Sequence, residues 1–256
     1  MPLRHLSISD LTLRGERALR PIGVYATLKR MLVRDGFVVR VPEVGSRHAH
    51  GDRVTFLNLT FWNARDPSDV LVDATLEADV LAHAAWHHAA KKALPRAGSP
   101  TAAALFLGES VASAFDLYLV GHLLRQGKKS AYLDSQVPAM SVAAQDAGLS
   151  PDVVEAMLAS VAEDPDRAFG DLRELLYDAA MALVTAPNVD AAATMLDGFA
   201  DHRFIGLLHH YELSNWVLYA RAYARPAEAS DPAVAMDRSM RAAPSTLGWL
   251  EANWLA

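Results

Sequence analysis

The stretch from Thr101 to Leu124, TAAALFLGESVASAFDLYLVGHLL, restricts the fold more than any other part of the chain. It is the most apolar segment, yet Glu109 and Asp116 lie near its middle. Charged side chains are costly at the centre of a bilayer, so a membrane span is disfavoured. We therefore expect a helix buried inside a protein, and no membrane partner.

The composition favours a helical protein that binds no nucleic acid. The chain has 256 residues, enough for one large domain or two small ones, and its 52% hydrophobic content rests heavily on alanine, a strong helix former. The net charge of −6 argues against a general nucleic-acid binder. The sequence MPLRHLSISDLTLRGER at the start has no apolar segment of the secretory type, and we expect a cytoplasmic protein.

The first part of the chain has a mixed pattern. A helical pattern runs from Arg20 to Arg34, whereas Phe37–Val41 and Val54–Trp62 are rich in β-branched and aromatic residues that favour strands. We expect residues 1–68 to form an N-terminal portion with a β-hairpin or small sheet. The predicted fold class is mainly α with this small β part, an α+β arrangement.

Residues 69–256 are predicted to form a helical body, expected to be one compact unit. Thr101 is a suitable N-cap for a helix that ends near Gln126, and the sequence Ser150-Pro151-Asp152 is typical of a helix start. Proline, glycine and charged breaks separate the other expected helices, which cover residues 69–94, 153–161, 171–184, 189–198, 203–223 and 234–241.

Three of the ten histidines crowd into one alanine-rich segment, LEADVLAHAAWHHAAKKAL. His83 and His87 are four residues apart, so a helix places them on one face, where both imidazoles can bind one ion. His88 lies about 100° around the helix from His87 and fits that pair poorly. The alternative is that these are ordinary helix histidines.

Glu109 is a candidate third ligand. It follows His87 by 22 residues, and the break PRAGSP between the two helices lets the second helix fold back. A buried carboxylate needs a partner, which a metal, an arginine or a hydroxyl network could supply. Asp116 is seven residues further on and could orient a ligand histidine, whereas His122 is expected at the surface. Because the chain has no cysteine, histidine and carboxylate side chains must supply any metal ligands.

A strand, a helix with H-x-x-x-H and a second helix with a glutamate resemble the zinc peptidases called gluzincins over about residues 54–124. The resemblance implies a zincin-like core in which His83, His87 and Glu109 bind zinc. The family motif, H-E-x-x-H, has a glutamate after the first histidine as the general base. This chain has Ala84 there, so peptidase action by that mechanism is not supported.

The ligand set leaves several functions open. We expect a metal-dependent enzyme that acts on a small organic or peptide substrate, with one zinc or iron(II) ion per chain. Two histidines and one carboxylate also form the ligand set of mononuclear non-haem iron oxygenases. A catalytically silent zincin-like protein that binds a partner is the alternative of another class. The alanine-rich helices could pack within one chain or form a homodimer.

A second polar cluster contains His202, His209, His210, Tyr211 and Glu212. On the expected helix 203–223, His210 and Tyr211 are candidate catalytic residues, because a histidine and a tyrosine can polarise a carbonyl or stabilise an oxyanion. His210 could also complete a metal shell. The alternative is a polar helix face with local hydrogen bonds, such as one between His209 and Glu212.

Overall fold

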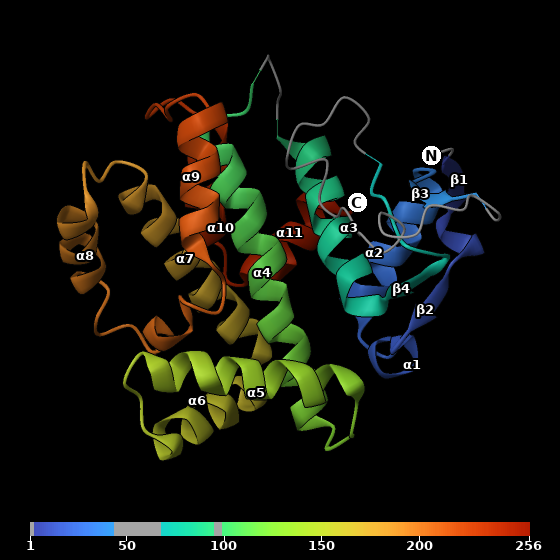
Figure 1. Cartoon of the computed structure of the whole chain (residues 1–256), viewed down its shortest axis with the longest axis horizontal. Helices are drawn as coiled ribbons and strands as arrows, with labels where there is room; N and C mark the ends of the chain where they lie inside the picture. The colour runs from blue at the N-terminus through green and yellow to red at the C-terminus, as the bar shows by residue number, and fades with distance from the viewer. Residues whose placement is uncertain (1–2, 44–67, 95–98) are drawn as a thin grey trace. The chain divides into compact units, whose positions relative to one another are not determined.

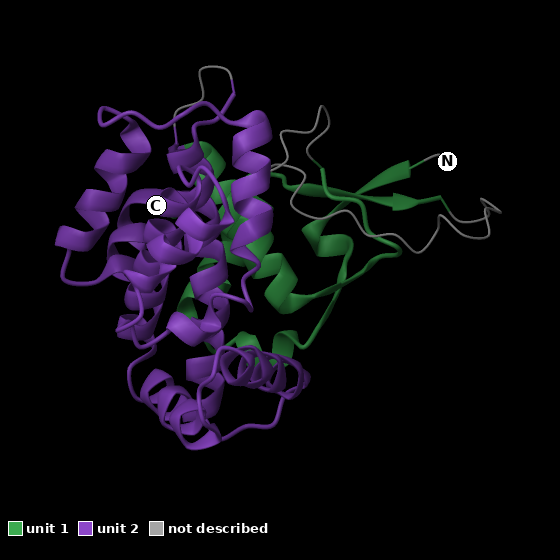
Figure 2. Cartoon of the chain, turned by 60° about the vertical axis from the view of Figure 1, so that its left-hand side comes forward, with its two compact units in different colours: residues 1–92, 255 green, residues 93–254, 256 purple. Residues whose placement is uncertain are grey.

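The computed structural model describes residues 3–43, 68–94 and 99–256 (Figure 1). The chain divides into two compact units, residues 1–92 with Leu255 and residues 93–254 with Ala256 (Figure 2). Eleven α-helices and four short strands lie in the described residues, which confirms the mainly α fold with a small N-terminal β part. The expected strand Val54–Trp62 lies outside the described residues. The boundary predicted after residue 68 stays a prediction.

In the part that the structure describes, the first unit contains two small sheets and three α-helices. Strand β1 (Leu3–Ser7) pairs antiparallel with β3 (Val38–Pro42), and β2 (Thr12–Arg14) pairs parallel with β4 (Thr75–Glu77). The helices are α1 (Glu16–Leu19), α2 (Gly23–Arg34) and α3 (Ala78–Ala93). Helix α2 buries Val24, Tyr25, Leu28, Met31 and Leu32, the spacing of an amphipathic helix. It ends where Gly36 takes a φ of 64°, a conformation that glycine adopts at little cost.

The helix predicted over residues 69–94 is wrong in its first third. Leu71 donates its backbone N–H to the carbonyl of Arg40, and Thr12 donates to the carbonyl of Ala74. Residues 75–77 then form β4 beside β2, and the helix begins only at Ala78. Pairing with strands that are distant in sequence therefore overrides the local helical preference.

The second unit is built around α4 (Ala102–Arg125), the green helix near the middle of Figure 1. Thr101 caps it by accepting the backbone N–H of Ala104 at 3.2 Å, as the sequence predicted. It packs against the helices α5 (Ala131–Asp146), α6 (Pro151–Glu163), α7 (Pro165–Leu183), α9 (Leu213–Tyr223) and α10 (Pro232–Ala242). Two further helices, α8 (Val189–Asp197) and α11 (Thr246–Trp254), pack against α7.

Among the described residues, α4 is the one helix with the length and composition to cross a membrane. Its most apolar stretch of 18 residues has a mean hydropathy of 1.4, and 89% of that stretch is buried inside the protein. Burial of this extent is expected of a core helix. The cytoplasmic localisation stays a prediction.

The helix predicted over residues 203–223 begins ten residues late, at Leu213. A short 3-10 turn, η3 (Ile205–Leu207), and further turns precede it, and Glu212 adopts a positive φ of 48°. At Gly206 an added Cβ would lie 2.7 Å from the end of the Leu149 side chain, so a larger residue there would require this leucine to shift. His209, His210 and Tyr211 therefore lie in these turns and not on the predicted helix.

A buried ion network joins α7 to α10. Arg173 has no exposed surface and donates from Nη1 to Asp237, which is 8% exposed. Arg241 donates from Nε to the other oxygen of Asp237 at 2.8 Å and from Nη2 to Asp178 at 2.7 Å. Asp237 is therefore the hydrogen-bond acceptor of the buried guanidinium, and Glu174, 3.4 Å from Nη2, is a second ion-pair partner.

Replacing Asp237 with alanine should lower the free energy of unfolding by about 3–5 kcal/mol, because it leaves the charge of Arg173 buried without this partner. The matched control is Asp178→Ala, whose side chain is 43% exposed, and it should cost less than about 1 kcal/mol. Urea unfolding measures both. Equal losses in the two variants would contradict the role assigned to Asp237.

The close approach of α4 to α6 and α7 depends on Gly121. An added Cβ would lie 2.6 Å from the Val161 carbonyl oxygen and 3.1 Å from the Pro165 Cβ. We expect Gly121→Ala to destabilise the protein by about 1–3 kcal/mol through overpacking. At Gly248 in α11 an added Cβ makes only ordinary contacts, the nearest at 3.4 Å, so Gly248→Ala should leave thermal unfolding unchanged or slightly higher.

Candidate metal centre

Helix α3 places His83 and His87 one turn apart, as predicted. Their Nε2 atoms are 3.2 Å apart, and their ring centroids are separated by 4.9 Å with the planes tilted by 58°. His87 is 5% exposed and His83 is half-buried. Two imidazole nitrogens therefore face each other in a site with little access to water.

The spacing of the two nitrogens fits a shared ion. Ligand nitrogens that lie about 2.0–2.1 Å from zinc at tetrahedral angles are about 3.3 Å from each other. The same spacing allows a hydrogen bond in which one neutral ring donates to the other. The two histidines by themselves are compatible with both arrangements.

The third member of the cluster is Glu109 of α4. Its side chain is 6% exposed in a helix whose neighbouring positions are almost all apolar and buried. His83, His87 and Glu109 each offer one ligand atom, and these atoms lie within 4.8 Å of one another. The residues predicted from sequence as ligands therefore form a cluster that could hold one metal ion, whose identity is not determined.

His88 does not belong to this cluster. Its Nε2 lies 3.0 Å from Asp35, and its ring packs edge-on against Phe37, with the centroids 5.4 Å apart. Burial lowers the pKa of His88, although the neighbouring Asp35 carboxylate opposes that shift. His88 therefore provides a control residue directly beside a candidate ligand.

The sequence analysis also assigned places or roles to His122 and Asp116 of α4. His122 was expected at the surface but is half-buried: it packs against Tyr118, and its Nε2 has no hydrogen-bond partner among the described residues. Asp116 is half-buried, and its backbone carbonyl accepts the Tyr132 hydroxyl at 3.0 Å. The predicted role of Asp116 in orienting a ligand histidine stays a prediction.

His210 and Tyr211 lie in the turns before α9, with their rings edge to face and their centroids 4.9 Å apart. Burial lowers the pKa of His210 and raises the pKa of Tyr211 well above its usual value. The charge of Asp116 acts on both groups. The Tyr211 hydroxyl is buried without a hydrogen-bond partner among the described residues. Their catalytic role stays a prediction.

Comparison with known proteins adds no family. No protein-family model matches the chain, and neither the curated proteins nor the solved structures contain a significant match. The zincin resemblance is thus supported only by the cluster of His83, His87 and Glu109. Fold and site together define a mostly helical protein with a candidate three-residue metal centre.

Removing the Tyr211 hydroxyl should not destabilise the protein. Because this buried donor has no partner among the described residues, Tyr211→Phe should leave the free energy of unfolding unchanged or raise it by up to about 1 kcal/mol. Thermal unfolding measures the effect. A loss above about 1 kcal/mol would show that the hydroxyl contributes to folding, and would argue against a group held in reserve for a ligand.

Proposed function

We propose that this protein is a metal-dependent enzyme in which His83, His87 and Glu109 hold one ion and a small organic molecule is the substrate. The observation that carries the proposal is the convergence of two imidazole nitrogens, 3.2 Å apart, with a buried carboxylate. A buried carboxylate is costly to ionise, and a bound cation would stabilise its charged form. Three protein ligands also leave coordination positions for water or substrate.

The residues around the ion decide which chemistry is available. A bound zinc or iron ion would polarise a substrate oxygen or activate water. Ala84 is 7% exposed and carries no group that can transfer a proton, so the base cannot come from the position after His83. His210 and Tyr211 are the groups that we propose to bind and orient the substrate. The lowered pKa of His210 keeps its imidazole neutral and able to accept a proton.

Two histidines and one carboxylate also support a second candidate, a mononuclear non-haem iron oxygenase. Nitrogens at right angles in an octahedral iron shell would be about 3.0 Å apart, close to the observed 3.2 Å. Zinc would exclude the oxygenase, because zinc cannot cycle between oxidation states, whereas iron would be compatible with both candidates.

Metal content tests the ligand assignment. Protein purified without added metal or chelator should contain about one zinc or iron ion per chain by plasma mass spectrometry. His87→Ala and Glu109→Gln should each lower that content at least about 10-fold, because each removes one of three ligands. His88→Ala is the matched control: it removes a neighbouring imidazole that is bound to Asp35, and it should retain the ion.

Each possible result of the metal analysis leads to a different conclusion. Wild-type protein that takes up no ion, even when reconstituted with zinc or iron(II), would refute the metal centre and favour the catalytically silent alternative. An ion that survives in both ligand variants would show that other residues bind it.

To test for an open coordination position, the cobalt(II)-loaded protein is titrated with azide. A shift in its visible spectrum is expected, and an unchanged spectrum would indicate a closed, structural site.

A further inference from the structure

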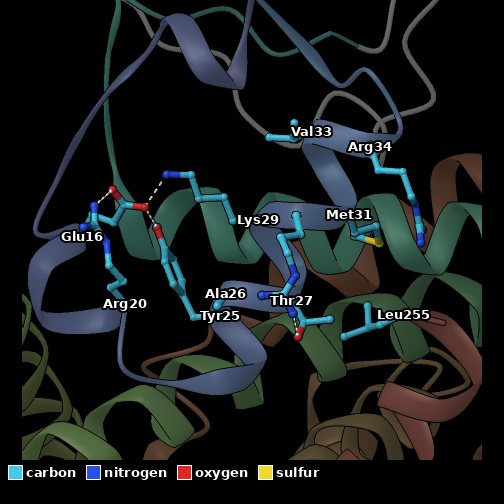
Figure 3. A pocket seen from close by; sticks show the side chains of 11 residues that line it. Glu16, Arg20, Tyr25, Ala26, Thr27, Lys29, Met31, Val33, Arg34 and Leu255 are labelled. Carbon is cyan, nitrogen blue, oxygen red and sulfur yellow. Dashed lines mark hydrogen bonds and ion pairs between the residues drawn. The ribbon is translucent and has the colours of Figure 1, made fainter.

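A second candidate site lies in the first unit, in a pocket of about 830 Å³ along α1 and α2 (Figure 3). Four of its lining side chains are cations, Arg20, Lys29, Arg30 and Arg34, whereas Glu16 is the single acid among the described lining residues. Its volume is in the range of small-molecule sites. None of these residues belongs to the metal cluster.

Glu16 offsets only part of this positive charge. It accepts hydrogen bonds from Arg20 at 3.1 Å, from Lys29, and from the Tyr25 hydroxyl at 3.4 Å, as the dashed lines in Figure 3 mark. Burial raises the pKa of Glu16, but these hydrogen bonds outweigh burial and the pKa is lowered overall. The carboxylate therefore stays ionised and holds Arg20 and Lys29 at one end of the pocket.

Arg30 and Arg34 extend the positive charge along α2. They are four residues apart on one helix face, where like charges repel in the absence of a ligand. Arg30 donates from Nη2 to the Thr27 hydroxyl at 2.9 Å, and Arg34 donates from Nε to Asp35 at 3.0 Å. A guanidinium has five N–H donors, so both keep donors for an anion.

The remaining lining is largely apolar. Met31 is 2% exposed and Leu255 is 5% exposed, and both line the pocket (Figure 3). Ala26 and Val33 also line it. A ligand with an apolar part as well as anionic groups would therefore match the pocket better than a bare anion.

The net positive charge of residues 3–42 also favours an anionic ligand. Residues 3–42 contain eight arginines and lysines but three acids, in a chain whose net charge is −6. Each of those acids is already engaged: Asp10 by Ser7, Glu16 by Arg20 and Lys29, and Asp35 by Arg34 and Lys92. The excess of positive charge raises the local concentration of anions.

We propose that this pocket binds an organic diphosphate, with the phosphate groups on Lys29, Arg30 and Arg34 and the organic part against Met31 and Leu255. The guanidinium groups suit phosphate oxygens because their planar donors can bind two oxygens at once. Arg30 and Arg34 are offset by about 6 Å along the helix axis, which suits two linked phosphates better than one.

Binding is tested by calorimetry with inorganic pyrophosphate and with geranyl diphosphate. The His87→Ala background is used so that diphosphate cannot bind through a metal ion. We expect geranyl diphosphate to bind more tightly than pyrophosphate, and Arg30→Gln to weaken both at least about 10-fold. The matched control is Arg14→Gln, which removes an equal charge from β2, where Arg14 pairs with Glu77 at 2.7 Å, outside the pocket.

Three results would overturn the proposal: no heat with either diphosphate, equal weakening by Arg30→Gln and Arg14→Gln, or binding only to vesicles that contain phosphatidic acid. Binding only to such vesicles would indicate that these basic side chains contact a membrane surface and not a soluble diphosphate. Arg30→Gln should unfold at the same temperature as the background protein or a higher one, because it removes a repulsion with Arg34. A lost fold would therefore not be mistaken for lost binding.

Discussion

The burial of a carboxylate within the apolar helix α4 is the constraint on which the rest of this account depends. Most of α4 lies inside the second unit, so the side chain of Glu109 is removed from water together with its apolar neighbours. A charge in such surroundings must be neutralised, paired or bound to a cation. Together with one ring nitrogen each of His83 and His87, this carboxylate forms a cluster that could hold one metal ion.

Sequence patterns predicted the parts of the fold that depend on local interactions. The apolar run of α4 and its cap at Thr101 are both confirmed, because a capping hydroxyl and a buried helix face need only nearby residues. The spacing of His83 and His87 predicted their facing nitrogens for the same reason. Glu109 was found because it is a single carboxylate among apolar residues in the sequence.

The failures lie where distant contacts decide the structure. Residues 69–77 pair with Arg40 and β2, and the turns around Gly206 pack against Leu149, which is distant in sequence. Neither contact can be read from local periodicity. The diphosphate pocket was also missed, although a signal was available in the excess of basic residues over residues 3–42. The net charge of −6 was considered for the whole chain, so the excess of basic residues over residues 3–42 was missed.

The central claim is that His83, His87 and Glu109 bind one ion, and anomalous diffraction tests it most directly. Crystals of the metal-loaded protein are measured on both sides of the zinc or iron absorption edge. We expect one anomalous peak about 2.0–2.2 Å from the Nε2 atoms of His83 and His87 and from a carboxylate oxygen of Glu109. Density without such a peak, in which the two histidines are hydrogen-bonded directly to each other, would contradict it.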